Sequence, residues 1–167
     1  MLRFTVLFCL FLAGLFALEV LQPVDEHVIV PFTTGIAKLC TTLISAFDHN
    51  AVSVGKVIRS TQNGFAVSIE RGCNGVEAVI ILFAAIFAFP ASLKHKLAGF
   101  AVGFVAIQGL NLVRIVSLFY LGQWSMTWFE WFHLYLWQAL IIIDALVVWL
   151  LWLRWLPRAA PPPAPSG

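Results

Sequence analysis

The sequence predicts an all-α, polytopic integral membrane protein with about four membrane-spanning helices and a small extracytoplasmic segment. Of the 167 residues, 61% are hydrophobic and only 11% are charged, whereas soluble domains carry about 25% charged residues. The mean hydropathy is +0.94. Four apolar runs approach the ~20 residues that a helix needs to cross a bilayer. We therefore interpret residues 1–158 as a single membrane-embedded domain.

The predicted spans are residues 4–21, 76–91, 97–121 and 134–153. A secretory signal peptide is the alternative for the first run, but the small residue at the plausible cleavage position, Ala17, has no small residue two positions before it. We therefore expect a retained membrane helix. Pro90 is expected to end the second run, Gly122 follows the third, and Arg154 and Arg158 follow the fourth.

The distribution of basic residues predicts that both termini face the cytoplasm, because short loops rich in Lys and Arg stay inside. With the N-terminus inside, the inner segments contain no acidic residue and five basic ones: Arg3, Lys94, Lys96, Arg154 and Arg158. Residues 22–75 and 122–133 are then extracytoplasmic. The net charge is +2, and the basic residues are scattered, so the sequence does not favour a nucleic-acid partner.

The long outer segment is predicted to contain one helix and one hairpin. Residues 28–47 are apolar but interrupted by Pro31, Gly35 and Lys38, which favours an amphipathic or partly inserted helix rather than a fifth span. β-Branched residues alternate on either side of Asn63-Gly64, and this pattern is typical of a β-hairpin. Residues 159–167 contain four prolines and are predicted to form a disordered cytoplasmic tail.

Cys73 is the first candidate for chemistry, because it lies in the turn Gly72-Cys73-Asn74-Gly75 just before the second predicted span. Asn74 is expected to cap that helix, with Glu77 at its third position, as in a capping box. The positive end of the helix is expected to stabilise a Cys73 thiolate. Two alternatives stay open, namely a small buried apolar residue and a disulfide with Cys40.

Arg114 is the second candidate, because it lies inside the third predicted span, roughly 10 Å from its outer end at ~1.5 Å per residue. A charged side chain in a membrane indicates a functional site unless it only reaches the interface or pairs with another helix. Asp144 in the fourth predicted span is a candidate partner, and the spacing leaves open whether it pairs with Arg114 or with a neighbouring helix. Asn111 lies one turn away and shares the face of Arg114.

His133 is the third candidate, because it opens the fourth predicted span at the same outer face as Cys73 and Arg114. A thiol, an imidazole and a guanidinium are a sufficient set for acyl transfer. The sequence contains no compact metal-ligand motif, so neither a metal nor another cofactor is predicted.

Three motifs together resemble the exosortase and archaeosortase family, and most closely its short exosortase H type. They are Gly72-Cys73-Asn74-Gly75 opening a membrane helix, Asn111-Leu112-Val113-Arg114-Ile115 on the next helix, and His133 opening the last. The resemblance covers roughly residues 50–155. It implies a membrane cysteine protease or transpeptidase with Cys73 as nucleophile, Arg114 as the essential arginine and His133 as acid and base.

The resemblance also implies a location and partners. It implies a multi-pass protein of the bacterial cytoplasmic membrane, surrounded by lipid, with its active site facing outward. Its substrates would be exported proteins that end in a short motif, a membrane helix and a basic tail, and the product could pass to a cell-surface acceptor. The alternative is a non-enzymatic membrane assembly or small transporter subunit, in which Asn111, Arg114 and Asp144 hold helices together. That alternative does not need Cys73.

Overall fold

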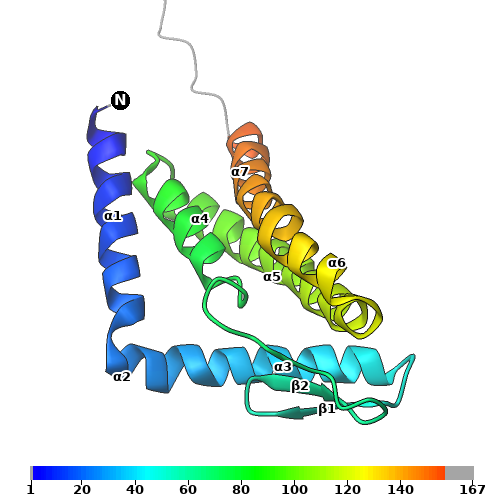
Figure 1. Ribbon diagram of the computed structural model, residues 1–167. Helices are drawn as coiled ribbons and strands as arrows, with labels where there is room; N and C mark the ends of the chain where they lie inside the picture. The colour runs from blue at the N-terminus through cyan, green and yellow to red at the C-terminus, as the bar shows by residue number, and fades with distance from the viewer. Residues whose placement is uncertain (1, 157–167) are drawn as a thin grey trace, which may run out of the picture.

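The structure is a computed structural model that describes residues 2–156, and it consists of a group of helices with a small antiparallel sheet at one end (Figure 1). The helical elements are α1 (Leu2–Val20), α2 (Gln22–Val24), the π-helical turn η1 (Asp25–Ile29), α3 (Val30–Ser45), α4 (Val76–Ala88), α5 (Leu93–Trp124), α6 (Met126–Trp131), the π-helical turn η2 (Phe132–Leu136) and α7 (Trp137–Trp155). The strands are β1 (Ala51–Val54), β2 (Val57–Ser60) and β3 (Ala66–Ser68). The predicted disordered tail, residues 159–167, lies outside the described residues.

Within residues 2–156, four helical stretches are long and apolar enough to cross a membrane, and they run over Leu2–Val20, Gln22–Ser45, Leu93–Trp124 and Met126–Trp155. α4 has 13 residues, or about 20 Å at ~1.5 Å per residue, which is less than the ~30 Å of a hydrocarbon core. The candidate spans therefore differ from the predicted spans at two places: Gln22–Ser45 is long enough to span although no span is predicted there, and the predicted span over residues 76–91 is too short. The predicted fold class, an all-α polytopic membrane protein with a small non-helical segment, is confirmed.

The orientation of α3 separates it from the other long helices. Figure 1 shows α3 running crosswise to α1, at the end of the group formed by α1, α4, α5 and α7, with the sheet beside it. α1 packs against α4, and α4 packs against both α5 and α7. The buried residues of α3 follow one helical stripe: Thr33, Ile36, Ala37, Cys40 and Ile44. A crosswise helix with one buried stripe is typical of an amphipathic helix at a membrane surface.

Two helix boundaries differ from the prediction for local reasons. α4 ends at Ala88, before Phe89 takes an extended conformation (φ −75°, ψ 140°), because the proline that follows disfavours a helical residue before it. The predicted outer loop over residues 122–133 is largely helical, because Ser125 alone interrupts α5 and α6 with an extended backbone (φ −158°, ψ 122°). No glycine or proline lies between Gln123 and Trp137 to end a helix there.

The sheet contains the predicted hairpin and one strand that was not predicted. β2 and β3 are joined around Asn63-Gly64, where Gly64 has a φ of +74°. β1 and β2 are joined by the two-residue turn Gly55-Lys56, in which Gly55 has a φ of +58°. A positive φ at the first turn residue alone is typical of a type II′ hairpin.

Two hydrophobic clusters meet near the segment that joins β3 to α4. The first packs α3 and the sheet against α5, and contains Ile36, Ala37, Cys40, Ile44, Ala51, Ile58, Ile69, Ile115 and Phe119. The second packs α4, α5 and α7 together, and contains Ala78, Leu82, Ile86, Ile107, Ala145 and Trp152. Ile69, before the Cys73 turn, belongs to the first cluster, and Ala78, after the turn, belongs to the second, so the two clusters fix both ends of the turn.

Candidate active site

The turn that carries Cys73 has a backbone that requires glycine at two places. Gly72 and Gly75 have φ values of +79° and +78°, and the N–H of Cys73 donates to the carbonyl of Glu70 (2.9 Å). A Cβ on Gly75 would lie 2.9 Å from Nε2 of Gln108. Gly75 is therefore needed both for its left-handed backbone and for the close approach of the turn to α5.

Asn74 and Glu77 hold this turn, although the helix begins one residue later than predicted. Gly75, rather than Asn74, is the N-cap of α4, and the Asn74 side-chain oxygen accepts the first N–H of the helix (3.0 Å). The Asn74 amide donates to Oγ1 of Thr33 on α3 (3.2 Å). The Glu77 carboxylate accepts the N–H of Gly72, so both predicted supporting residues bond within the turn or to its neighbours.

Arg114 reaches the Cys73 turn from α5. Its side chain is buried, with 1% exposed; Nη1 donates to the carbonyl of Gly72 (3.1 Å) and Nη2 lies 3.6 Å from Sγ of Cys73. Asp144 is not its partner, because the ion pairs within residues 2–156 are Lys56–Glu70 and Arg71–Asp25. The guanidinium therefore binds the turn rather than another membrane helix.

His133 approaches the thiol from η2, the helical turn between α6 and α7. Its Nε2 lies 3.0 Å from Sγ of Cys73, and its ring stacks on Phe129 with centroids 5.6 Å apart. His133 belongs to the π-helical turn η2, and π-helical turns are frequent at functional sites because they redirect side chains. The structure thus brings together Cys73, Arg114 and His133 from three separate segments.

Burial controls the protonation of Cys73. Desolvation raises the pKa of the Cys73 thiol above its ordinary value, and the positive charge of Arg114 only partly opposes this effect. This direction is opposite to the one expected for a thiolate stabilised by a helix end. A protonated thiol needs a base, and His133 is within hydrogen-bond distance.

Asn111, the remaining predicted supporting residue, lies under the turn. It is 1% exposed, and its amide nitrogen is 3.3 Å from the position of a Cβ on Gly75. Its amide donates weakly to Oε1 of Gln108 (3.5 Å), and its oxygen has no hydrogen-bond partner within the described part of the chain. Asn111 and Gln108 together form the α5 surface on which Gly75 rests.

The alternative of a disulfide between Cys40 and Cys73 finds no support in the structure. Cys40 and Cys73 are both free thiols, and Cys40 is fully buried between α3 and the sheet. Within residues 2–156, no three His, Cys, Asp or Glu side chains gather closely enough to hold a metal ion.

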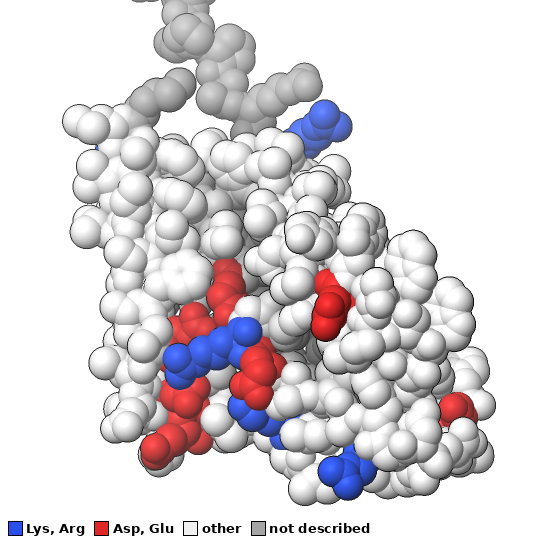
Figure 2. All heavy atoms as spheres, viewed as in Figure 1, with Lys and Arg blue, Asp and Glu red and all other residues white. Residues whose placement is uncertain are grey.

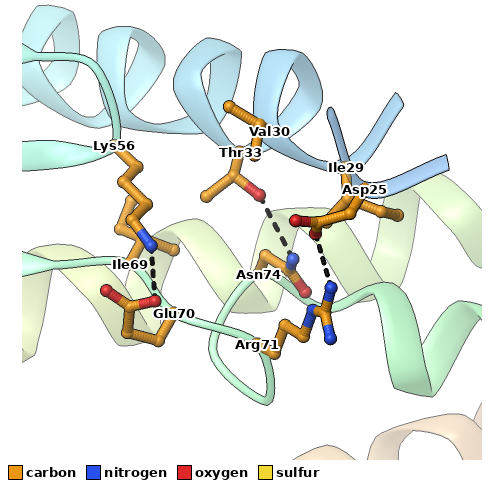
Figure 3. Close-up of a pocket in the computed structure, with 9 residues that line it drawn as sticks. All are labelled: Asp25, Ile29, Val30, Thr33, Lys56, Ile69, Glu70, Arg71 and Asn74. Carbon is orange, nitrogen blue, oxygen red and sulfur yellow. Dashed lines mark hydrogen bonds and ion pairs between the residues drawn. The ribbon is translucent and has the colours of Figure 1, made fainter. Parts of the chain in front are cut away.

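A cavity of about 350 Å³ lies beside the Cys73 turn (Figure 3). It is lined by Asp25, Ile29, Val30, Thr33, Lys56, Ile69, Glu70, Arg71 and Asn74. Nη2 of Arg71 lies 2.7 Å from Oδ1 of Asp25, while the hydrogen bond from Lys56 lowers the pKa of Glu70. Figure 2 shows basic and acidic side chains gathered together on a face that is otherwise largely uncharged.

Of the residues that tie this turn to the outer helices, the sequence predicts a supporting role only for Asn74. Arg71 pairs with Asp25 of η1, and Asn74 bonds to Thr33 of α3. The two pairs are separated by 46 and 41 residues, and no local periodicity links a loop to a helix that lies so far away in the sequence. The ion pair therefore had no signal beyond a charged residue in each segment.

A comparison with protein families identifies this chain. A family model described as transmembrane exosortase (EpsH type) matches residues 1–137, a range that contains Cys73, Arg114 and His133. No curated protein and no solved structure matches the chain. The match covers well over half of the 167 residues and confirms the family that the sequence motifs resemble. The chain belongs to the transmembrane exosortase family.

Proposed function

We propose that this chain is a cysteine protease or transpeptidase that cleaves the C-terminal sorting signals of exported proteins at the outer face of the bacterial cytoplasmic membrane. Exosortases are membrane enzymes of protein sorting. One observation carries the finer proposal: Sγ of Cys73 lies 3.0 Å from Nε2 of His133 and 3.6 Å from Nη2 of Arg114. A nucleophile, a base and a cation thus share one site.

The first half of the proposed reaction forms a thioester. Nε2 of His133 takes the proton of the Cys73 thiol, while Sγ attacks the carbonyl carbon of the scissile peptide bond. The tetrahedral intermediate then collapses, the C–N bond breaks, and His133 gives its proton to the leaving amine. The fragment that carries the membrane helix leaves as this amine, and the exported protein stays on Cys73 as an acyl group.

The second half releases the exported protein. Water, or an amine or hydroxyl of a cell-surface acceptor, attacks the thioester carbon and loses its proton to His133. The C–S bond breaks, and the proton returns to Sγ to restore the thiol. Attack by water completes hydrolysis, and attack by an acceptor completes transpeptidation, with the same residues in the same roles.

Arg114 is suited to position the turn and to stabilise negative charge. Nη1 is held by the carbonyl of Gly72, so the planar guanidinium presents Nη2 to the sulfur and to the neighbouring position where the oxyanion develops. Losing one well-placed oxyanion donor typically costs ~100- to 1,000-fold in rate. In a non-enzymatic assembly subunit this arginine would instead be expected to join helices, for example through Asp144.

The test is processing of an exported protein from the same genome that ends in a short motif, a membrane helix and a basic tail. The protein is expressed together with the wild-type chain, Cys73→Ala or Cys40→Ala, and its C-terminal cleavage is measured. We expect Cys73→Ala to stop cleavage at unchanged membrane abundance, because alanine is small and apolar. Cys40→Ala is the matched control, because it removes a buried sulfur in the same cluster and is expected to retain cleavage. Continued cleavage by Cys73→Ala would contradict the proposal.

A further inference from the structure

β3 is an edge strand with one unused side. The strand order is β1-β2-β3. The Phe65 carbonyl accepts the N–H of Ser60 (2.7 Å), and the N–H of Ile69 donates to the carbonyl of Lys56 (3.0 Å). Residues of an antiparallel strand alternate between pointing their backbone groups toward the neighbouring strand and away from it. The N–H and C=O groups of Ala66 and Ser68 therefore point away from β2.

This edge is open to a partner. Ala66 and Ser68 are both exposed, and no other element in residues 2–156 bonds to their outward backbone groups. Proteins usually cover or block such an edge, because it binds other extended chains. Here the strand carries neither a proline nor a charged residue, so an added strand meets no obstacle of that kind.

The open edge leads directly to the candidate nucleophile. Cys73 follows Ser68 by five residues, a span of at most ~17 Å for an extended chain. Just before β3, the ring of Phe65 packs against the ring of Phe129, with centroids 6.3 Å apart. In the segment after β3, Sγ of Cys73 lies 3.0 Å from Nε2 of His133. A peptide that lies along β3 therefore arrives at the thiol and imidazole.

We infer that the outer edge of β3 is the docking site for the substrate, which adds to the sheet as a fourth strand. The inference rests on the proposed function, and it concerns the extended segment that precedes the scissile bond. β3 precedes Cys73 in the chain, and the membrane helix of the substrate follows the cleavage site. The segment therefore pairs in parallel with β3 and brings its scissile carbonyl to Sγ of Cys73.

Proline substitution on the two edges of the same sheet tests this docking. In Ser68→Pro an outward N–H is replaced by a ring, while the bonds between β2 and β3 remain. Ser53→Pro is the matched control on β1, because the bond from Thr61 N–H to the Asn50 carbonyl (2.9 Å) places the Ser53 N–H on the opposite outer edge by the same alternation. Ser68→Ala accounts separately for the hydroxyl bond to Glu70 (2.7 Å).

We expect Ser68→Pro to process the substrate at least about fivefold more slowly than Ser68→Ala, with both rates normalised to membrane abundance. Fivefold is the factor that corresponds to the loss of one hydrogen bond. Ser53→Pro is expected to process at the wild-type rate. Equal processing by Ser68→Pro and Ser53→Pro would overturn the docking site. That result would leave the proposed function intact, because cleavage by the wild-type chain would still depend on Cys73.

Disulfide cross-linking measures the docking without catalysis. Ser68→Cys or Ser53→Cys is introduced into a chain in which Cys9, Cys40 and Cys73 are replaced by alanine. The exported protein described above carries single cysteines at successive positions before its membrane helix, and copper phenanthroline is the oxidant. We expect cross-links to Ser68→Cys at every second substrate position, the period of a strand, and none to Ser53→Cys. Cross-links without this period, or equal cross-links at both edges, would overturn the inference.

Discussion

Arg114 is bonded to the same turn that carries the Cys73 thiol, with Nη2 3.6 Å from Sγ and Nη1 3.1 Å from the carbonyl of Gly72. A buried charge in a membrane protein must find partners, and here the partners belong to the candidate site itself. The arginine therefore links the shape of the turn to the chemistry of the sulfur. This link gives predictions that separate a catalytic arginine from a structural one.

Arg114→Lys is expected to leave the chain inserted and abundant but to reduce processing by ~100-fold or more. Lysine keeps the charge and most of the stem, but it lacks the planar fork that bonds Gly72 and faces Cys73 at the same time. The measurement is substrate cleavage normalised to membrane abundance, with Asp144→Asn as the comparison. Near-normal cleavage by Arg114→Lys, together with loss in Asp144→Asn, would remove Arg114 from the catalytic set.

The reaction of Cys73 with iodoacetamide is expected to rise with pH and to reach half of its maximum above the ~8.5 of an ordinary thiol. The thiolate is the reactive form, and burial raises the pKa of Cys73 while Arg114 lowers it. Arg114→Gln removes the opposing charge, so its midpoint is expected at a still higher pH. The measurement is the labelling rate as a function of pH in a Cys9→Ala, Cys40→Ala background. A midpoint below 8.5 in that background would indicate a stabilised thiolate instead.

Gly75→Ala is expected to lower both thermal stability and processing more than Gly64→Ala does. Both glycines have positive φ values, so both variants carry a strain of ~1–2 kcal/mol. A Cβ on Gly75 also meets Gln108 at 2.9 Å, whereas a Cβ on Gly64 meets nothing within 4 Å. Melting temperatures in detergent and cleavage rates check this difference. Equal effects of the two substitutions would show that the contact with α5 is unimportant.

An impermeant thiol reagent applied to intact cells is expected to label Asn63→Cys and Ser125→Cys but not His95→Cys. The first two lie beside the sheet and between α5 and α6, whereas His95 lies near the start of α5. The native cysteines are replaced by alanine, and labelling after lysis controls for accessibility. Labelling of His95→Cys from outside would place Cys73 on the cytoplasmic face.

The sequence was most informative about single residues and least informative about their contacts. Cys73, Arg114 and His133 attract attention because each is a reactive or charged side chain beside or within an apolar run. Their separations of 41 and 60 residues prevent any local pattern from predicting that they touch. Membrane topology supplies the missing constraint, because it assigns each residue to one side of the bilayer.

The features that were mispredicted depend on tertiary packing. Burial raises the pKa of Cys73, and a helix-end pattern in the sequence does not reveal that burial. β2 was not predicted because Val57–Ser60 is short and contains Arg59, and because the glycine of the preceding turn was not recognised as a hairpin signal. In contrast, Asn63-Gly64 determines its turn locally, and this turn and the strand after it agree with the prediction, although the strand before it is β2 rather than the predicted Val52–Val54.

Interception of the acyl intermediate by hydroxylamine tests the central claim most directly. Hydroxylamine attacks a thioester, breaks its C–S bond and leaves the acyl group as a hydroxamic acid. If Cys73 forms a thioester, mass spectrometry of the cleaved exported protein should show a C-terminal hydroxamate that increases with hydroxylamine concentration. A product that ends in a carboxylate at every hydroxylamine concentration, and that also forms with Cys73→Ala, would contradict the account.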